Sequence, residues 1–163
     1  MYNNVCFRRN GDVYELLRKL RFAVDRGNMK MCVFCDIIGR KSEAKIVYES
    51  DRVIVFLDIE PISNGHVLIL PKVHVDSITK LSQDYLVEVM ETAKHIVKVF
   101  ENDYKHSSYS IMQNGGECCD FGHFHLHVFP RVKGDGFGWT YPENGGKYTD
   151  EIANDLREKL SNK

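Results

Sequence analysis

The segment from residue 123 to residue 129 reads His-Phe-His-Leu-His-Val-Phe, and this alternation constrains the fold more than any other feature of the chain. Successive side chains of a β-strand point to opposite faces of a sheet. We therefore expect a strand over residues 122–129 with three imidazoles on one face and apolar side chains on the other. Three neighbouring imidazoles, spread over about 13 Å, are costly to bury unless they are solvated, paired or ligated. The alternation thus predicts a functional site on the histidine face.

Two chemistries suit such a row of imidazoles. Neutral imidazole is a common metal ligand, so the row could hold the ion of a metal-dependent hydrolase. An imidazole can also act as a nucleophile toward phosphorus while a neighbouring group handles protons. The residues alone leave both interpretations open.

The rest of the chain predicts one α+β domain. Ser82 is a good N-cap for a long amphipathic helix that ends near Asp103, and Thr149 caps a short last helix. We expect an antiparallel five-stranded meander sheet with one long helix and shorter terminal helices. Besides the histidine segment, apolar runs bounded by turn residues predict strands over residues 45–49, 52–58, 66–70 and 108–113.

Three parts follow one another along the chain. Residues 1–29 are expected to form a helical extension, because an apolar face recurs at helical spacing over 12–26 before Gly27 and Asn28 stop the helix. Residues 30–131 form the main domain, and residues 132–163 form a C-terminal tail with the short helix.

The composition limits the partners and the compartment. The 163 residues carry a formal net charge of −1, so no global field recruits nucleic acid or an anionic membrane. No apolar run approaches the roughly 18–20 residues that span a bilayer, and the first residues do not resemble a secretory signal. Five cysteines, an odd number, make a poor disulfide framework. We therefore expect a cytoplasmic protein with free or metal-bound thiols and with neither nucleic acid nor a membrane as partner.

The order of several motifs resembles the histidine-triad (HIT) nucleotide-binding family, whose signature alternates histidine and apolar residues as residues 123–129 do. The resemblance covers about residues 32–131 and identifies this stretch as an HIT-like nucleotide-binding catalytic domain. The other motifs that occur in the family's order are residues 32–38, 44–49, 56–59, 65–74, 114–116 and 129–131.

The resemblance implies a covalent mechanism. His125, the middle histidine, matches the nucleophile that attacks the α-phosphate and forms a nucleotidyl-histidine intermediate. His127 and His66 match positions around the phosphates, with roles in orientation, charge stabilisation or proton transfer. The implied activity is hydrolysis of nucleoside phosphoramidates or dinucleoside polyphosphates, which releases a nucleoside monophosphate. The alternatives are nucleotidyl transfer to phosphate or a sugar phosphate, and a nucleotide-binding module with little turnover.

The resemblance also implies a site for a purine nucleotide. The carboxylate of Asp58 is expected to accept hydrogen bonds from the ribose hydroxyls, Asn114 to contact phosphate or ribose, and Gly116 to let backbone N–H groups approach an anion. Cys119 and Asp120 stand where the family commonly has a glutamine and a small hydroxyl residue, which puts rate and leaving-group preference in question. The apolar residues that match the walls of the base pocket are Val33, Phe34, Ile37, Phe56, Leu57 and Ile59.

Cys32 and Cys35 have the spacing of half a tetrahedral zinc site. Similarity to the zinc-containing bacterial branch of the family implies that His74 and His123 complete a structural zinc site. The alternative is a pair of small buried thiols beside unligated histidines. Resemblance to family members that form two-fold dimers also implies a homodimer.

Overall fold

The computed structural model describes residues 32–161 except for 107, 120, 140 and 144. The expected extension over residues 1–29, with its helix over 12–26, lies outside the described residues. The described elements are α2 (Val33–Ile38), β1 (Ile46–Glu49), β2 (Val53–Leu57), β3 (Val67–Pro71), the 3-10 helix η1 (Ile78–Lys80), α3 (Gln83–Asn102), β4 (Ser108–Met112), the 3-10 helix η2 (Gly116–Cys118), β5 (Leu126–Arg131) and α4 (Asp150–Ser161).

The five strands form one antiparallel sheet in the order β1-β2-β3-β5-β4. This confirms the predicted α+β class and the five-stranded antiparallel sheet. The order differs from a simple meander in the last two strands, because α3 carries the chain from β3 to the far edge before β5 returns to the gap. The return places β5, with the last residues of the histidine segment, inside the sheet.

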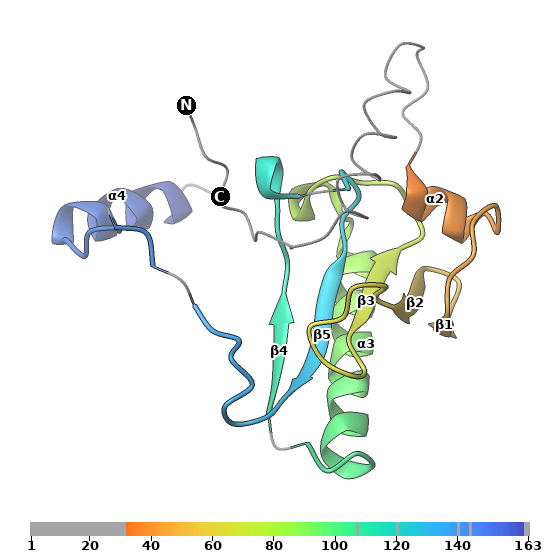
Figure 1. The fold of residues 1–163 in the computed structure, drawn as a ribbon. Coiled ribbons are helices and arrows are strands. Elements are labelled where there is room, and N and C mark those ends of the chain that lie inside the picture. The colour runs from red at the N-terminus through yellow and green to blue at the C-terminus, as the bar shows by residue number, and fades with distance from the viewer. Residues whose placement is uncertain (1–31, 107, 120, 140, 144, 162–163) are drawn as a thin grey trace.

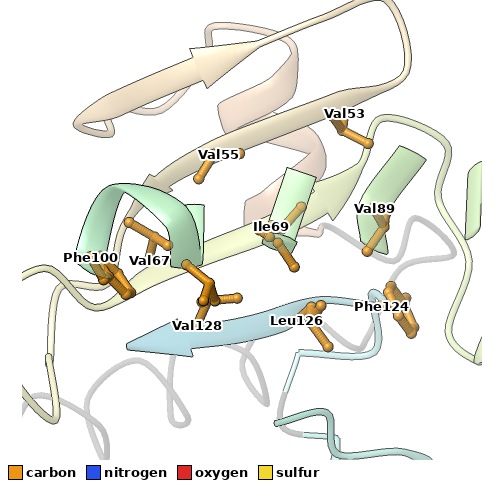
Figure 2. Packing of buried hydrophobic residues seen from close by; sticks show 11 residues of the cluster. Val53, Val55, Val67, Ile69, Val89, Phe100, Phe124, Leu126 and Val128 are labelled. Atoms are coloured by element: carbon orange, nitrogen blue, oxygen red, sulfur yellow. The ribbon is translucent and has the colours of Figure 1, made fainter. Parts of the chain in front are cut away.

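Strand alternation divides the apolar residues between the two faces of the sheet. Figure 1 shows the long helix α3 lying across one face. Val53 and Val55 of β2 point to that face, and Figure 2 shows the same cluster closed by side chains from β3, α3 and β5. The intervening Ile54 and Phe56 point to the other face, where they meet Phe34 of α2. A short N-terminal helix over Val33–Ile38, which the sequence did not predict, therefore covers the second face.

The histidine segment enters the sheet later than predicted. We expected a strand from residue 122, but β5 begins at Leu126, and its pairing with β3 ends at Ile69↔Leu126. The same register continued would set Phe124 against Pro71, and a proline has no N–H to donate to a ladder. The Phe124 N–H instead donates to the carbonyl of Val75 (2.6 Å). The alternation itself persists: Phe124 joins the core under α3, and His127 points to the α2 face beside Leu68.

The C-terminal helix begins where it was predicted. Thr149 caps α4 by accepting a hydrogen bond from the N–H of Ile152 at 3.3 Å. The helix lies apart from the sheet in Figure 1, and none of its residues is buried. No helix in the described part of the chain has the length and apolar character needed to cross a membrane.

Candidate functional site

The predicted functional side chains gather in two clusters on the α2 face. The first cluster brings together Cys32, Cys35, His74 and His123, and the second brings together Asp58, His66 and His127. In each cluster the potential ligand atoms lie within 4.8 Å of one another. His125 stands between the clusters in the sequence. The structure therefore gathers residues that are up to 91 positions apart, such as Cys32 and His123.

His125 is held by a backbone carbonyl. Its Nδ1 lies 2.8 Å from the carbonyl oxygen of His123, which can only accept, so Nδ1 carries the proton. In the neutral ring the lone pair is then at Nε2. The ring packs edge-on against Phe34 and Phe121, with centroids 5.2 and 5.9 Å away, and is only 4% exposed. An imidazole in this state is a nucleophile that needs no deprotonation before it attacks.

His66 and His127 form a hydrogen-bonded pair. The Nε2 of His66 lies 3.0 Å from the Nδ1 of His127. His66 follows Gly65, whose φ of +93° favours glycine at this turn. The carboxylate of Asp58 faces both rings, with Oδ2 at 3.6 Å from the Nδ1 of His66 and 3.7 Å from the Nδ1 of His127. The pair and the carboxylate therefore act as one electrostatic unit.

The Asp58 carboxylate is more enclosed than a ribose-binding role suggests. Its Oδ1 accepts a hydrogen bond from the N–H of Glu60 (2.9 Å), and its Oδ2 is buried against the histidine pair. The side chain as a whole is 7% exposed. The ribose contact that the resemblance implies thus requires the approach of a ligand to a carboxylate that is already turned toward the imidazoles.

The residues expected to wall a base pocket do not all lie on one face. Phe34, Ile37 and Phe56 are buried together on the α2 face. Leu57 packs on the opposite face with the α3 cluster, because neighbouring strand residues alternate. Val33 and Ile59 are exposed, at 41% and 77%. Phe34 therefore packs against the ring of His125, and Ile37 and Phe56 share the core cluster of Phe34.

The loop after β4 carries the remaining predicted residues. Asn114 is half-buried, and Gly116 opens η2 with a φ of +63° and free space around its α-carbon. Cys119 is half-buried, with its Sγ 3.9 Å from the carbonyl oxygen of His123. Phe121, which was not predicted from the sequence, packs on Phe34, and the centroids of the two rings are 4.8 Å apart. An aromatic residue two positions before the triad was the available signal.

The first cluster has the dimensions of a zinc site. Tetrahedral bonds of about 2.1 Å to nitrogen and about 2.3 Å to sulfur set neighbouring ligand atoms about 3.3–3.8 Å apart. The Nδ1 of His123 lies 3.4 Å from the Sγ of Cys32, 3.6 Å from the Sγ of Cys35 and 3.3 Å from the Nδ1 of His74, and the last two atoms are 3.2 Å from each other. Three of these distances lie in the tetrahedral range and the 3.2 Å distance lies just below it, so the four donors fit a zinc ion after a small adjustment.

The protonation of His123 suits a ligand. Its Nε2 lies 3.1 Å from the carbonyl oxygen of Pro71, so Nε2 carries the proton and Nδ1 turns its lone pair to the cluster. Burial lowers the pKa of His123 to about 4, which keeps the ring neutral. Burial, together with the hydrogen bond and charge of Cys32, raises the pKa of the Cys35 thiol to about 11. A metal that binds at neutral pH therefore displaces a proton from Cys35.

The cysteines differ from one expectation. Cys32, Cys35 and Cys119 are free thiols, as predicted, but Cys118 is disulfide-bonded. The prediction that the cysteines are free or metal-bound is therefore wrong for Cys118. The odd number of cysteines does not exclude a disulfide, because a chain with five cysteines can form one disulfide and keep three thiols.

A five-stranded antiparallel sheet with one long helix on one face and a row of buried imidazoles on the other defines a histidine-triad fold. The family model described as HIT domain matches residues 40–134, more than half of the chain. The chain belongs to this family.

Relatives share most of their length with this chain. An uncharacterised HIT-like protein of Methanocaldococcus jannaschii is 33% identical over 129 residues, which cover 78% of this chain and 99% of the relative. An adenosine 5'-monophosphoramidase of Candida albicans is 30% identical, with 80% and 91% covered. The crystal structure of a zinc-bound histidine triad family protein from Mycobacterium smegmatis matches with a TM-score of 0.61 and 27% identity, over 80% of this chain and 93% of that one.

Proposed function

We propose that the protein is a nucleotide hydrolase that acts at the α-phosphate of nucleoside phosphoramidates or dinucleoside polyphosphates and releases a nucleoside monophosphate. The observation that carries the proposal is the state of His125: its Nδ1–H is bonded to a carbonyl, so a lone pair stands at Nε2 in an apolar, nearly closed setting. The name of the Candida albicans relative, an adenosine 5'-monophosphoramidase, supports a nucleoside phosphoramidate as substrate.

The reaction has two displacements at phosphorus. In the first, the Nε2 lone pair of His125 forms a bond to the α-phosphorus while the bond to the leaving nitrogen or oxygen breaks, and the leaving group keeps that electron pair and takes up a proton from solvent water. In the second, water attacks the same phosphorus and releases one proton to the solvent, and the bond to His125 breaks with its electron pair returning to the ring. His127 and His66 orient the phosphate and stabilise its charge.

The nucleotide is proposed to lie along the α2 face. Phe34, Ile37 and Phe56 form the apolar contact for a purine base, and Asp58 accepts hydrogen bonds from the ribose hydroxyls. Asn114 and the backbone of Gly116 contact the phosphates. We assign Val33 and Ile59 to the exposed rim, where a ligand would cover part of their surface, and we assign Leu57 to the core rather than to the pocket.

Cys32, Cys35, His74 and His123 are proposed to hold a structural zinc ion. When bound, zinc ties α2 to the segment before β5, because two ligands flank the start of α2 and a third, His123, is the first histidine of the triad. His123 is then committed to structure. In this proposal His123 binds the metal and His125 is the nucleophile.

Transfer of the nucleotidyl group to phosphate or a sugar phosphate is the second candidate function. The observation that favours it is Cys119, which stands half-buried where the family commonly has a glutamine and so changes the leaving-group side of the site. An acceptor that enters on this side takes the place of water in the second displacement.

We also propose a homodimer in the cytoplasm. The dimer rests on the resemblance to two-fold family members, and light scattering of the purified protein tests it. The free thiols of Cys32, Cys35 and Cys119 support a reducing compartment, and the disulfide at Cys118 is the observation against it. A thiol count on protein purified without reductant decides between the two.

The test of the function compares the wild-type protein with His125→Ala and with His95→Ala, which removes an exposed histidine of α3. Each protein is incubated with adenosine 5'-phosphoramidate and with diadenosine tetraphosphate, and intact masses are recorded during turnover. We expect a nucleotidyl adduct and turnover in the wild type and in His95→Ala, and a loss of about 10³-fold or more in His125→Ala.

The other outcomes are distinct. Turnover of His125→Ala at the wild-type rate removes His125 as the nucleophile. Failure of all three proteins on every nucleotide, with binding retained, indicates a binding module. Turnover by the metal-loaded protein without any adduct, together with loss of turnover on chelation while the protein stays folded, indicates a metal-dependent hydrolase.

A further inference from the structure

The backbone N–H of Ile62 determines where the proton of His66 lies. This N–H donates to the Nδ1 of His66 at 3.1 Å. A backbone amide can only donate, so the Nδ1 of His66 must carry a lone pair. In the neutral ring the single proton is then at Nε2. The His66 side chain is 1% exposed, and its own backbone N–H is bonded to the carbonyl of Ser63, so the ring is held in this position.

The proton of His66 determines the tautomer of His127 in turn. The proton at the Nε2 of His66 points to the Nδ1 of His127, 3.0 Å away, and the Nδ1 of His127 must therefore accept. The proton of the neutral His127 ring is then at its Nε2. Each ring transmits the requirement because one nitrogen accepts only when the other carries the proton.

The result complements the state of His125. Its Nδ1–H is bonded to the His123 carbonyl, so its Nε2 has a lone pair. His127 and His125 are neighbours, with ring centroids 4.9 Å apart. Two adjacent imidazoles thus offer opposite groups at the same ring position, a lone pair on one and an N–H on the other.

We propose that the Ile62 backbone N–H, acting through His66, fixes His127 as an Nε2–H donor beside the nucleophilic Nε2 of His125. The inference rests on the proposed function, because the donor acts on the phosphoryl oxygen or the leaving atom of the substrate that His125 attacks. His66 and the Ile62 amide are positioning groups. The hydrogen bond from a fixed donor of this kind becomes stronger as negative charge develops on the reacting phosphate.

The neutral state of the ring sets the role of His127. A neutral imidazole N–H is a very weak acid, so the neutral His127 ring does not readily give up its Nε2 proton at neutral pH. The pair therefore donates a hydrogen bond during the displacement and is not the source of the proton that the leaving group takes up.

One group opposes this arrangement. The Oδ2 of Asp58 faces the Nδ1 atoms of both His66 and His127, at 3.6 and 3.7 Å, and its negative charge favours a proton on either atom. The competing state is a charged His66 with an Nδ1–H directed at Asp58. That state would set the N–H of His66 against the N–H of Ile62 at 3.1 Å, so the two assignments exclude each other.

The test reads the ring protons directly. In protein labelled with ¹⁵N at histidine, long-range ¹H–¹⁵N spectra at pH 7.5 distinguish the Nδ1–H form, the Nε2–H form and the charged ring. We expect the Nε2–H form for His66 and His127 and the Nδ1–H form for His125, in the absence of substrate. A charged His66, or an Nδ1–H form of His66 or His127, in the wild-type protein overturns the proposal.

Substitution of Ile62 tests the cause. Ile62→Pro removes the N–H, and Ile62→Ala keeps it while shortening a side chain that is 42% exposed. We expect wild-type tautomers in Ile62→Ala. In Ile62→Pro we expect an Nδ1–H population of His66, a mixed tautomer of His127, and a kcat about tenfold below that of Ile62→Ala with a similar KM.

The outcomes separate this inference from the proposed function. Unchanged tautomers in a folded Ile62→Pro variant overturn the role of the amide, whatever the activity. Correct tautomers without any nucleotidyl adduct on His125 refute the nucleophile and leave the proton assignment intact. A Pro variant that does not fold leaves the wild-type spectra as the deciding measurement.

Discussion

Removal of the proposed zinc ion should weaken the fold by a predictable amount. All four donor atoms lie within 4.8 Å of one another, and four of the pairs are 3.2–3.6 Å apart, so zinc can bind with only a small adjustment of the site. A ligand that binds only the folded state stabilises it by RT ln(1 + [L]/Kd), which is about 4 kcal/mol when free zinc exceeds Kd about a thousandfold. For a domain of this size, 1 kcal/mol shifts Tm by about 3–4 °C, so the shift is about 12–16 °C.

The perturbation is Cys35→Ser, with Cys119→Ser as the matched control. Cys119 is a free, half-buried thiol outside the ligand set. We expect one zinc per chain in the wild type and in Cys119→Ser, little zinc in Cys35→Ser, and a Tm drop of about 12–16 °C in Cys35→Ser. The measurements are elemental analysis and differential scanning calorimetry.

The dependence on pH gives a second check of the same site. The pKa of Cys35 is raised to about 11, so the thiol is protonated at all working pH values and zinc must displace its proton. Zinc affinity therefore rises with pH, about tenfold per unit for each proton released, and falls as the solution is acidified. Wild-type protein that holds zinc no better at pH 8 than at pH 6, or a Cys35→Ser variant with unchanged Tm and zinc content, refutes the reasoning.

Three further predictions concern the frame around the site. Phe124→Ala should cost about 3–5 kcal/mol in urea unfolding, because the ring is 1% exposed in the core under α3; a cost below 1 kcal/mol contradicts the packing. Gly65→Ala should cost about 1–2 kcal/mol, since its φ is +93°, and should lower kcat through His66; unchanged stability refutes the strain. Asp58→Asn should raise KM about tenfold for a ribonucleotide and much less for its 2′-deoxy analogue if the carboxylate binds the ribose, each hydroxyl bond to a charged group being worth about 1.5–3 kcal/mol; equal effects on both substrates indicate that Asp58 serves the histidine pair instead.

Much of the fold was predictable because it depends on local periodicity. The apolar stripe after Ser82 correctly predicted α3, and Thr149 correctly predicted the start of α4. The order of β4 and β5 was not predictable in this way, because strand periodicity says which residues share a face and not which strands are neighbours. The early end of the β5 ladder was missed for the same reason, since it depends on which residue Pro71 opposes.

The candidate site was predictable at the level of residue types. His123, His125 and His127, with Cys32 and Cys35, were found from spacing, and His66, His74 and Asp58 from the resemblance. The division of the triad between two clusters depends on carbonyl and amide groups, the oxygens of Pro71 and His123 and the N–H of Ile62. Nearly every residue has the same backbone N–H and carbonyl groups, so the sequence does not show which of these groups will bond to the histidines.

Pro71 has a consequence for any attempt to move this chemistry to another protein. If a His-Phe-His-Leu-His strand were transplanted alone, all of its residues would pair with the neighbouring strand of the host sheet. Its imidazoles would then be buried beside the side chains of that strand. The proline opposite the strand has to be transplanted as well, because it has no N–H to donate to the ladder. The first two histidines then stay outside the strand pairing, and the first of them bonds to the proline carbonyl. A design that copies this site therefore has to copy the interruption of the β-ladder as well as the histidine side chains.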